Sequence, residues 1–302
     1  MTGSRAEHLV SAVALRHRPT MESTVILDVR VDALGRPDHD AHLRGHIPTA
    51  RFVDLDVDLS GTVGPRSGAR PLPEIDQLRA SLRRWGITPA TPVVVHDDST
   101  SAAAARAWWV LRWAGVRDVR LLDGGLRSWI DAGGDIARGP RTAPRPVLGA
   151  SRAIRPRPGG LPVVEIDDIV EVTRRAVLLD ARPAEHFAGR EGGAAHIPGA
   201  ISAPVFDDFD DHGRLRPADE LAARYRSLGV DLRRASPGAE HADVVAATYC
   251  SSGVAAALQV LVLATLGVSA ALYPGSLSQW ISDPARLTVG SAITPRPTAD
   301  IA

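Results

Sequence analysis

The sequence is short of cysteine and of net charge. Cys250 is the single cysteine among 302 residues, so no disulfide can form within the chain. A lone thiol is stable in a reducing compartment, and we therefore expect a cytoplasmic protein. The 35 acidic and 35 basic residues give a formal net charge of zero. A nucleic-acid-binding protein normally carries a clustered basic excess, so the composition argues against a nucleic-acid partner.

We also expect neither a leader nor a membrane span. Residues 1–18 mix charged and polar side chains, without the apolar core of a secretory signal. One apolar stretch, Val254–Tyr273, approaches the length of a membrane span. It contains Gln259 and Gly267, and it divides into a predicted buried helix over 254–265 and a strand over 268–273. We therefore expect no membrane-spanning segment.

The chain does contain an internal repeat. Three motifs of the first half recur in the second half, in the same order, at offsets of 150 to 152 residues. The pairs are Val25–Arg30 with Val177–Arg182, Gly45–Ala50 with Ala195–Ala200, and Gly124–Trp129 with Gly275–Trp280. Matches at almost one offset indicate a tandem duplication. The length suits two domains, predicted over 1–138 and 163–302, with a Pro-, Arg- and Gly-rich linker over 139–162.

Short apolar segments alternate with helical patterns in each half. The predicted strands cover 24–29, 92–96 and 119–122, then 176–180, 244–249 and 270–273. The predicted helices cover 75–85, 102–113, 218–228 and 254–265. This alternation predicts an α/β fold in which each half is a mostly parallel sheet with helices on both faces. Ligands bind such sheets beyond the carboxyl ends of the strands.

Cys250 lies between a predicted strand and a predicted helix. We therefore expect its sulfur at the carboxyl edge of the sheet and at the N-terminus of the helix that begins near Val254. Unpaired amides and the positive end of the helix dipole favour the thiolate, which is the nucleophilic form. Gly253 lets the backbone curl around the sulfur. The structural alternative is a buried cysteine that only packs as a small apolar side chain.

The surrounding residues carry a specific resemblance. The loop Cys250-Ser251-Ser252-Gly253-Val254-Ala255 resembles the six-residue active-site loop of rhodanese-type sulfurtransferases. The likeness extends from about Val25 to Trp280 through motifs that resemble those flanking this loop in the family: Asp180–Arg182, His196–Ala200 and Gly275–Trp280. It implies two tandem rhodanese-like domains, of which the second is catalytic. Asp97 stands at the cysteine position of the first domain, which implies that this domain is catalytically silent.

The resemblance also implies a reaction. The thiolate takes a sulfane sulfur from thiosulfate or the thiol sulfur of 3-mercaptopyruvate, and the resulting persulfide passes it to a thiol or to cyanide. The implied partners are small molecules, and no metal or organic cofactor is implied. A tandem protein already contains an interdomain cleft, so we expect a monomer.

The loop residues bear on the choice of donor. Thiosulfate-preferring members have basic residues directly after the cysteine, whereas Ser251, Ser252 and Gly253 are uncharged and favour 3-mercaptopyruvate. The mercaptopyruvate branch also has a Ser–His–Asp relay, whose serine and aspartate match Ser252 and Asp56. Arg70 stands at the position of the histidine. An arginine cannot shuttle a proton near neutral pH, so the relay is incomplete.

Four candidates for substrate binding follow from the same resemblance. In the family, arginines of the second domain hold the anionic group of the substrate. His186 occupies the position of one of them, and Arg190 is a further candidate. Arg182 more often makes a structural salt bridge in this family, and we expect Asp180 and Arg182 to be structural residues near the site. Asp56 and Arg70 are the other two candidates. We hypothesise that the Arg70 guanidinium anchors the carboxylate or sulfonate group of the donor.

Two other functions compete with this prediction. A cysteine phosphatase of the same fold needs an arginine six residues after the cysteine, but Ala256 stands there. A non-catalytic sulfur-sensing or scaffold protein stays open, because His186 and Arg70 depart from the family pattern. The acidic segment Asp207–His212 lacks the spacing of an EF-hand and is predicted to be a solvated loop.

Overall fold

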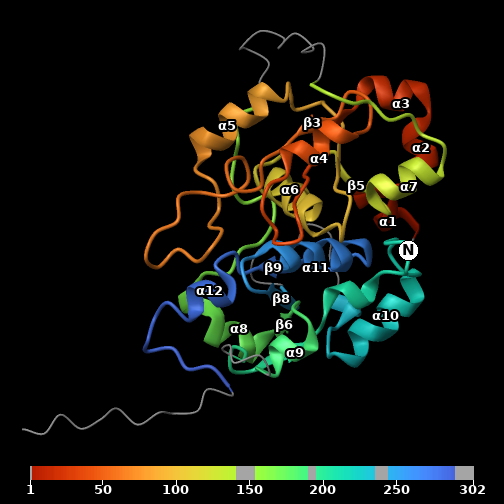
Figure 1. Cartoon of the computed structure of the whole chain (residues 1–302). Helices are drawn as coiled ribbons and strands as arrows, with labels where there is room; N and C mark the ends of the chain where they lie inside the picture. The colour runs from red at the N-terminus through yellow and green to blue at the C-terminus, as the bar shows by residue number, and fades with distance from the viewer. Residues whose placement is uncertain (1, 141–153, 190–194, 235–243, 290–302) are drawn as a thin grey trace, which may run out of the picture.

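Two parallel sheets organise the computed structural model, which describes residues 2–140, 154–189, 195–234 and 244–289 (Figure 1). Their strand orders are β1-β5-β4-β2-β3 and β7-β6-β8-β9. The strands are Leu9–Val10 (β1), Val25–Asp28 (β2), Arg51–Phe52 (β3), Val93–His96 (β4), Val119–Leu122 (β5), Val177–Asp180 (β6), Ala200–Ser202 (β7), Ala246–Tyr249 (β8) and Ala270–Leu272 (β9). All pairings between named strands are parallel, which confirms the predicted α/β fold of two sheets.

Helices cover both faces of each sheet. Those of the first half are Thr2–His8 (α1), Ala12–Arg16 (α2), Arg18–Ser23 (α3), His39–Arg44 (α4), Ile75–Arg84 (α5), Ala102–Trp113 (α6) and Gly125–Asp131 (α7). Those of the second half are Ile169–Arg175 (α8), Ala184–Phe187 (α9), Ala218–Ser227 (α10), Val254–Thr265 (α11) and Ser276–Trp280 (α12). The four predicted helices are confirmed to within one residue. The others are too short to show a helical period in the sequence.

Matching contacts confirm the duplication. Asp28 at the end of β2 pairs with Arg30, and Asp180 at the end of β6 pairs with Arg182. Each arginine also donates to a backbone carbonyl of the repeated turn, Arg30 to Gly45 and Arg182 to Ala195. Both ion pairs are buried. Most of the predicted linker lies outside the described residues, and the domain bounds stay a prediction.

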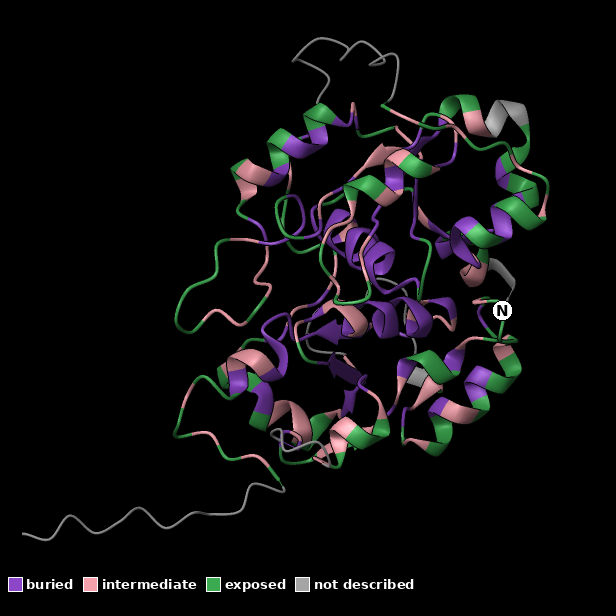
Figure 2. Cartoon of the chain, viewed as in Figure 1, coloured by how far each residue is buried: buried purple, intermediate pink, exposed green. Residues whose placement is uncertain are grey.

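Helices α6 and α11 form the middle of the molecule. They pack directly against each other between the two sheets, and Figure 2 shows both as almost entirely buried. In the first sheet, Leu27 and Val95 face this central layer, whereas Ile26 and Val94 pack on the opposite side with α7. Successive strand residues point to opposite faces, so both faces are apolar and covered. One hydrophobic core therefore runs through both halves of the chain.

The same layering explains the long apolar stretch. Helix α11 is surrounded by β8, β9, α6 and α1, so it is apolar on every side and has no polar face. A separate strand, β9, follows it. Within the described ranges, no helix is long and apolar enough to cross a membrane.

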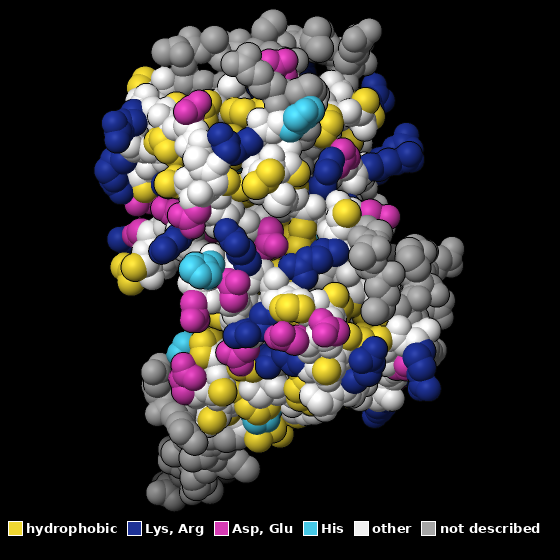
Figure 3. Space-filling view, turned by 90° about the vertical axis from the view of Figure 1, so that its right-hand side faces the viewer, with side chains coloured by type: hydrophobic (Ala, Val, Ile, Leu, Met, Phe, Trp, Pro, Cys, Tyr) yellow, Lys and Arg dark blue, Asp and Glu magenta, His cyan; other side chains and the backbone are white. Residues whose placement is uncertain are grey.

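The charged side chains are distributed as the balanced composition suggests. Figure 3 shows acidic and basic side chains intermixed over one face of the molecule. The prediction of a solvated loop at Asp207–His212 is wrong for Asp208, which is fully buried. The Tyr225 hydroxyl of α10 donates to the Asp208 carboxylate at 2.6 Å. Burial raises the pKa of Asp208 to about 6, because the charged form loses its hydration.

His8 of α1 predicts a pH dependence of stability. Its ring meets the Trp108 ring edge-on, and burial, aided by Arg112, lowers its pKa from 6.5 to about 4. The unfolded chain therefore binds the extra proton first, and stability falls as the pH drops from about 6.5 towards 4. Between pH 7 and pH 5, the free energy of unfolding measured with urea should therefore fall in the wild type. In His8→Phe, which has no group to titrate at this position, we expect this fall to be smaller by about 1–2 kcal/mol. An equal loss in both proteins would contradict this assignment.

Candidate active site

Cys250 occupies the position that the sequence predicts for it. It follows β8 directly and stands four residues before α11 begins at Val254. The backbone amide of Gly253 donates to the Cys250 Sγ at 3.1 Å. The side chain is 3% exposed, next to the exposed Ser251 and the partly exposed Ser252. The sulfur therefore lies just below the surface, at the N-terminus of a buried helix.

Gly253 is required by the shape of this loop. Its φ of 78° lies in the left-handed region, which side chains other than glycine rarely adopt. A Cβ atom at this position would lie 2.5 Å from the Pro274 carbonyl oxygen. Both constraints hold the amide in the orientation that points at the sulfur.

The first turn of α12 supports the loop from the other side. Ser276 is fully buried with a φ of 53°, and its hydroxyl accepts a hydrogen bond from the Cys250 amide at 3.2 Å. The amides of Leu277 and Ser278 donate to the carbonyls of Cys250 and Ser251, each at 3.0 Å. Sequence reasoning missed this role of Ser276. The repeat Gly124–Trp129 with Gly275–Trp280 was the available signal.

The first half contains the same cradle with a different occupant. Asp97 follows β4 as Cys250 follows β8, and the Leu126 amide donates to its carbonyl at 2.9 Å. The Asp97 carboxylate accepts hydrogen bonds from the amides of Ser99 and Ser101, both at 3.0 Å, and of Ala104 at 3.3 Å. Burial raises the pKa of Asp97, and these amides oppose that rise. Both loops thus direct helix-terminal amides at the side chain that follows the strand.

A segment of the first half, residues 61–73, reaches the mouth of the sulfur loop. Figure 1 shows it in orange, extending towards α12. The Ala69 amide donates to the Ser278 hydroxyl at 2.9 Å, and the Gln279 side chain donates to the Arg66 carbonyl at 3.0 Å. A Cβ at Gly68 would lie 2.6 Å from the Gly275 carbonyl oxygen. The region around Cys250 is therefore built from both halves of the chain.

Arg70 and Asp56, two of the predicted substrate-site residues, form an ion pair. The Arg70 Nε lies 2.8 Å from the Asp56 Oδ1, and its Nη2 donates to the Gly35 carbonyl at 2.8 Å. The Arg70 side chain is 21% exposed and that of Asp56 is 48% exposed. The aspartate that would orient a relay histidine is thus engaged by a permanent cation, and no proton can pass through this pair near neutral pH.

The predicted residues of the second half lie at the carboxyl edge of its sheet. Arg182 donates through Nε to both oxygens of Asp180, at 2.9 and 3.0 Å, and this buried pair holds the backbone after β6. His186 is partly buried on α9, which begins three residues after Ala181. Its role in substrate binding stays a prediction. Arg190 lies outside the described residues.

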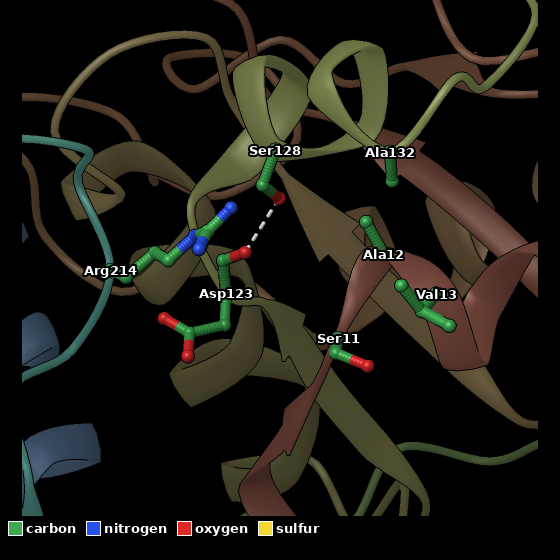
Figure 4. A pocket seen from close by; sticks show the side chains of 7 residues that line it. All are labelled: Ser11, Ala12, Val13, Asp123, Ser128, Ala132 and Arg214. Atoms are coloured by element: carbon green, nitrogen blue, oxygen red, sulfur yellow. Dashed lines mark hydrogen bonds between the residues drawn. The ribbon is translucent and has the colours of Figure 1, made fainter.

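A hollow of about 200 Å³ lies away from the sulfur loop (Figure 4). Arg214 of the second half approaches Asp123 and Ser128 of the first half there. The Asp123 carboxylate accepts a hydrogen bond from the Leu215 amide at 2.9 Å, and the Ser128 hydroxyl donates to the Asp123 carbonyl at 2.6 Å. The Asp123 carboxylate thus joins the two halves, whereas the Ser128 hydroxyl is bonded within the first half.

Comparison with known proteins agrees with this geometry. The sequence pattern of the rhodanese-like domain family matches residues 11–132 and 165–283. A putative thiosulfate sulfurtransferase, SseB, of Mycobacterium tuberculosis is 40% identical over 277 residues, covering 86% of this chain and 89% of its own. A probable 3-mercaptopyruvate sulfurtransferase of Pseudomonas aeruginosa is 37% identical over 297 residues, covering 92% and 96%. The crystal structure of Escherichia coli SseA, a 3-mercaptopyruvate sulfotransferase by its description, superposes with a TM-score of 0.72 at 29% identity, covering 89% and 98%.

Two glycines test the importance of the loop geometry. Gly253 and Gly267 both have a φ of 78°, but a Cβ at Gly267 would meet nothing within 4 Å. We expect Gly267→Ala to destabilise the protein by about 1–2 kcal/mol through backbone strain alone. Gly253→Ala adds the clash with Pro274 and should destabilise the protein further and slow alkylation of Cys250 by iodoacetamide at least about tenfold. Equal melting temperatures and alkylation rates for the two variants would refute the packing argument.

Proposed function

The chain belongs to the rhodanese-like family as a sulfurtransferase with two such domains, and we propose that Cys250 carries the transferred sulfur as a persulfide. One observation carries this proposal. The only thiol of the chain lies at a helix N-terminus and accepts a hydrogen bond from the Gly253 amide at 3.1 Å. Amides directed at a sulfur stabilise its anionic forms, and these are the reactive forms in sulfur transfer.

The first half-reaction forms the persulfide. With thiosulfate, the Cys250 thiolate attacks the sulfane sulfur, an S–S bond forms, and sulfite leaves with the electron pair of the broken S–S bond. With 3-mercaptopyruvate, the thiolate attacks the thiol sulfur and the C–S bond breaks. The electron pair passes to the carbon, which takes up the thiol proton and leaves as pyruvate. Each donor leaves one sulfur and one negative charge on Cys250.

The second half-reaction regenerates the thiolate. A thiol or cyanide attacks the outer sulfur of the persulfide, and the Cys250 thiolate leaves with the electron pair of the S–S bond. Splitting the transfer into two displacements keeps each barrier low. The Gly253 amide serves both steps, because it stabilises the Cys250 thiolate, which attacks in the first step and leaves in the second.

The first domain acts as a silent partner in this proposal. Asp97 fills its cradle, and a carboxylate has no sulfur with which to form a persulfide. This domain instead supplies the segment 61–73, which forms part of the site around Cys250. Comparison does not support the non-catalytic alternative, since the relatives are named as sulfurtransferases.

The uncharged loop favours 3-mercaptopyruvate as the donor. Ser251 and Ser252 add no positive charge beside the sulfur, whereas thiosulfate is a small dianion that basic loop residues would hold. One relative is named for thiosulfate and another for 3-mercaptopyruvate, so the preferred donor has to be decided by comparing kcat/KM for the two. Arg70, His186 and Arg190 are the candidate anchors for the carboxylate or sulfonate.

The proposal also includes the setting of the protein. The single thiol must stay reduced between turnovers, which favours a reducing compartment such as the cytoplasm. A monomer suffices, since the two halves of one chain already surround Cys250.

Intact mass spectrometry tests the proposed function. Wild-type protein incubated with 3-mercaptopyruvate or thiosulfate should gain one sulfur atom per chain, and a following addition of cyanide should remove it. Cys250→Ser, which keeps the size of the side chain, should gain none. Absence of the added sulfur with both donors would overturn the proposal.

A separate pair of variants tests Arg70 as an anchor. Arg70→Ala should raise the KM for the preferred donor about tenfold with little change in kcat, because it removes ground-state binding of an anionic group. Asp56→Asn breaks the same ion pair but keeps the guanidinium, and its KM should stay equal or fall. An unchanged KM for both donors in Arg70→Ala would exclude the anchor.

A further inference from the structure

Arg106 of α6 is a buried cation from the silent domain. It is fully buried, and its Nη1 donates to the Gly253 carbonyl of the sulfur loop at 3.4 Å. Its Nη2 donates to the carbonyls of Arg70 at 3.0 Å and of Pro71 at 3.3 Å. One guanidinium therefore joins the sulfur loop of the second domain to the segment 61–73 of the first domain.

The charge of Arg106 has no carboxylate partner in the described part of the chain. The other two buried arginines there are different, since Arg30 pairs with Asp28 and Arg182 pairs with Asp180. The Nε of Arg106 is also buried, and it has no hydrogen-bond acceptor among the described residues. Burying a guanidinium without an anion is costly, and such a charge is retained where an anion is available at least part of the time.

Burial lowers the pKa of the Arg106 guanidinium, and the negative charge that opposes this shift is that of the Cys250 sulfur. Gly253 links the two groups, because its carbonyl accepts from Arg106 and its amide donates to the Cys250 Sγ. A Cβ at Gly253 would lie 3.2 Å from the Arg106 Nη1, so the guanidinium packs directly on this residue. We infer that Arg106 is the positioning residue and counter-cation for the anionic sulfur at Cys250, both as thiolate and as persulfide.

This role has a geometric and an electrostatic part. The hydrogen bond to the Gly253 carbonyl fixes the peptide group whose neighbouring amide points at the sulfur. The positive charge acts through a buried, weakly screened medium and favours the anionic forms of the sulfur. Burial lowers the pKa of Arg106 to about 10, and the negative charge of Cys250 opposes this shift, so the guanidinium is cationic near neutral pH.

The role of Arg106 in sulfur transfer rests on the proposed function. The experiments that test it, alkylation and thermal unfolding, do not depend on sulfur transfer. This role gives the silent domain a definite share in the chemistry. The first domain has Asp97 in place of a cysteine and so has no reactive sulfur. Its helix α6, through Arg106, supplies the positive charge that the neutral loop Ser251-Ser252-Gly253 lacks. The positive charge thus lies beneath the loop instead of beside the sulfur.

Substitutions at Arg106 separate charge from packing. We expect Arg106→Met to slow alkylation of Cys250 by iodoacetamide at pH 7, and sulfur loading from the preferred donor, at least about tenfold, mainly in kcat. Arg106→Lys keeps the charge and should stay within about threefold of the wild type for alkylation. Arg112→Met on the same helix serves as the matched control, because its Nη1 donates to Arg117 far from the loop, and it should react like the wild type.

Two outcomes would overturn the inference. If Arg106→Met reacts like the wild type, the cation is not needed. If Arg106→Lys loses as much as Arg106→Met, only the packing of the arginine matters. Near-ultraviolet circular dichroism would establish that each variant is folded before its rates are compared.

A second measurement holds even if Arg106→Met fails to fold. In the wild-type background, Cys250→Asp places a carboxylate in the sulfur cradle, as Asp97 does in the first domain. Its pairing with Arg106 should give Cys250→Asp a higher melting temperature than Cys250→Ser, and the reverse order would contradict the inference. Neither alkylation nor melting uses a sulfur donor. Failure of the proposed function therefore shows as absent sulfur loading, independently of these results.

Discussion

The hydrogen bond from the Gly253 amide to the Cys250 sulfur sets the requirements for the whole site. It needs a left-handed glycine, and the Pro274 carbonyl leaves no room for a side chain there. It also needs the first turn of α12, where Ser276 adopts a positive φ in order to receive the Cys250 amide. Strand β8 and helix α11 fix the ends of the loop. Strain and burial are thus concentrated around one sulfur atom, as in many functional sites.

The duplication explains how two halves came to serve one sulfur. Helices α6 and α11 each begin at a cradle of backbone amides, and they pack together at the centre of the molecule. In one cradle, Asp97 supplies its own anion and the loop is complete. In the other, we propose that Cys250 alternates between thiolate and persulfide. Because α6 lies directly against α11, a side chain of the first half, Arg106, reaches the loop that follows Cys250.

Local sequence patterns predicted the longer helices and strands and the position of Cys250 between a strand and a helix. They did not predict contacts between residues that are distant in the sequence. Strands β1, β3 and β7 have only two or three residues, too few for a period to show. Arg106 looks like an ordinary polar residue of a helix, since its burial depends on a helix about 150 residues later. The ion pair between Arg70 and Asp56 depends on how segment 61–73 folds back, which no local signal records. Asp208 was assigned to solvent because the Tyr225 that buries it is distant in sequence.

A single-turnover chase with a labelled donor tests the central claim most directly. Protein would be loaded with radioactive sulfur from 3-mercaptopyruvate or thiosulfate, freed of donor, and divided between peptide mapping and reaction with cyanide. The account predicts one labelled sulfur per chain on the peptide that contains Cys250, and its complete release as thiocyanate. Label on any other peptide, or label on Cys250 that cyanide cannot remove, would contradict it.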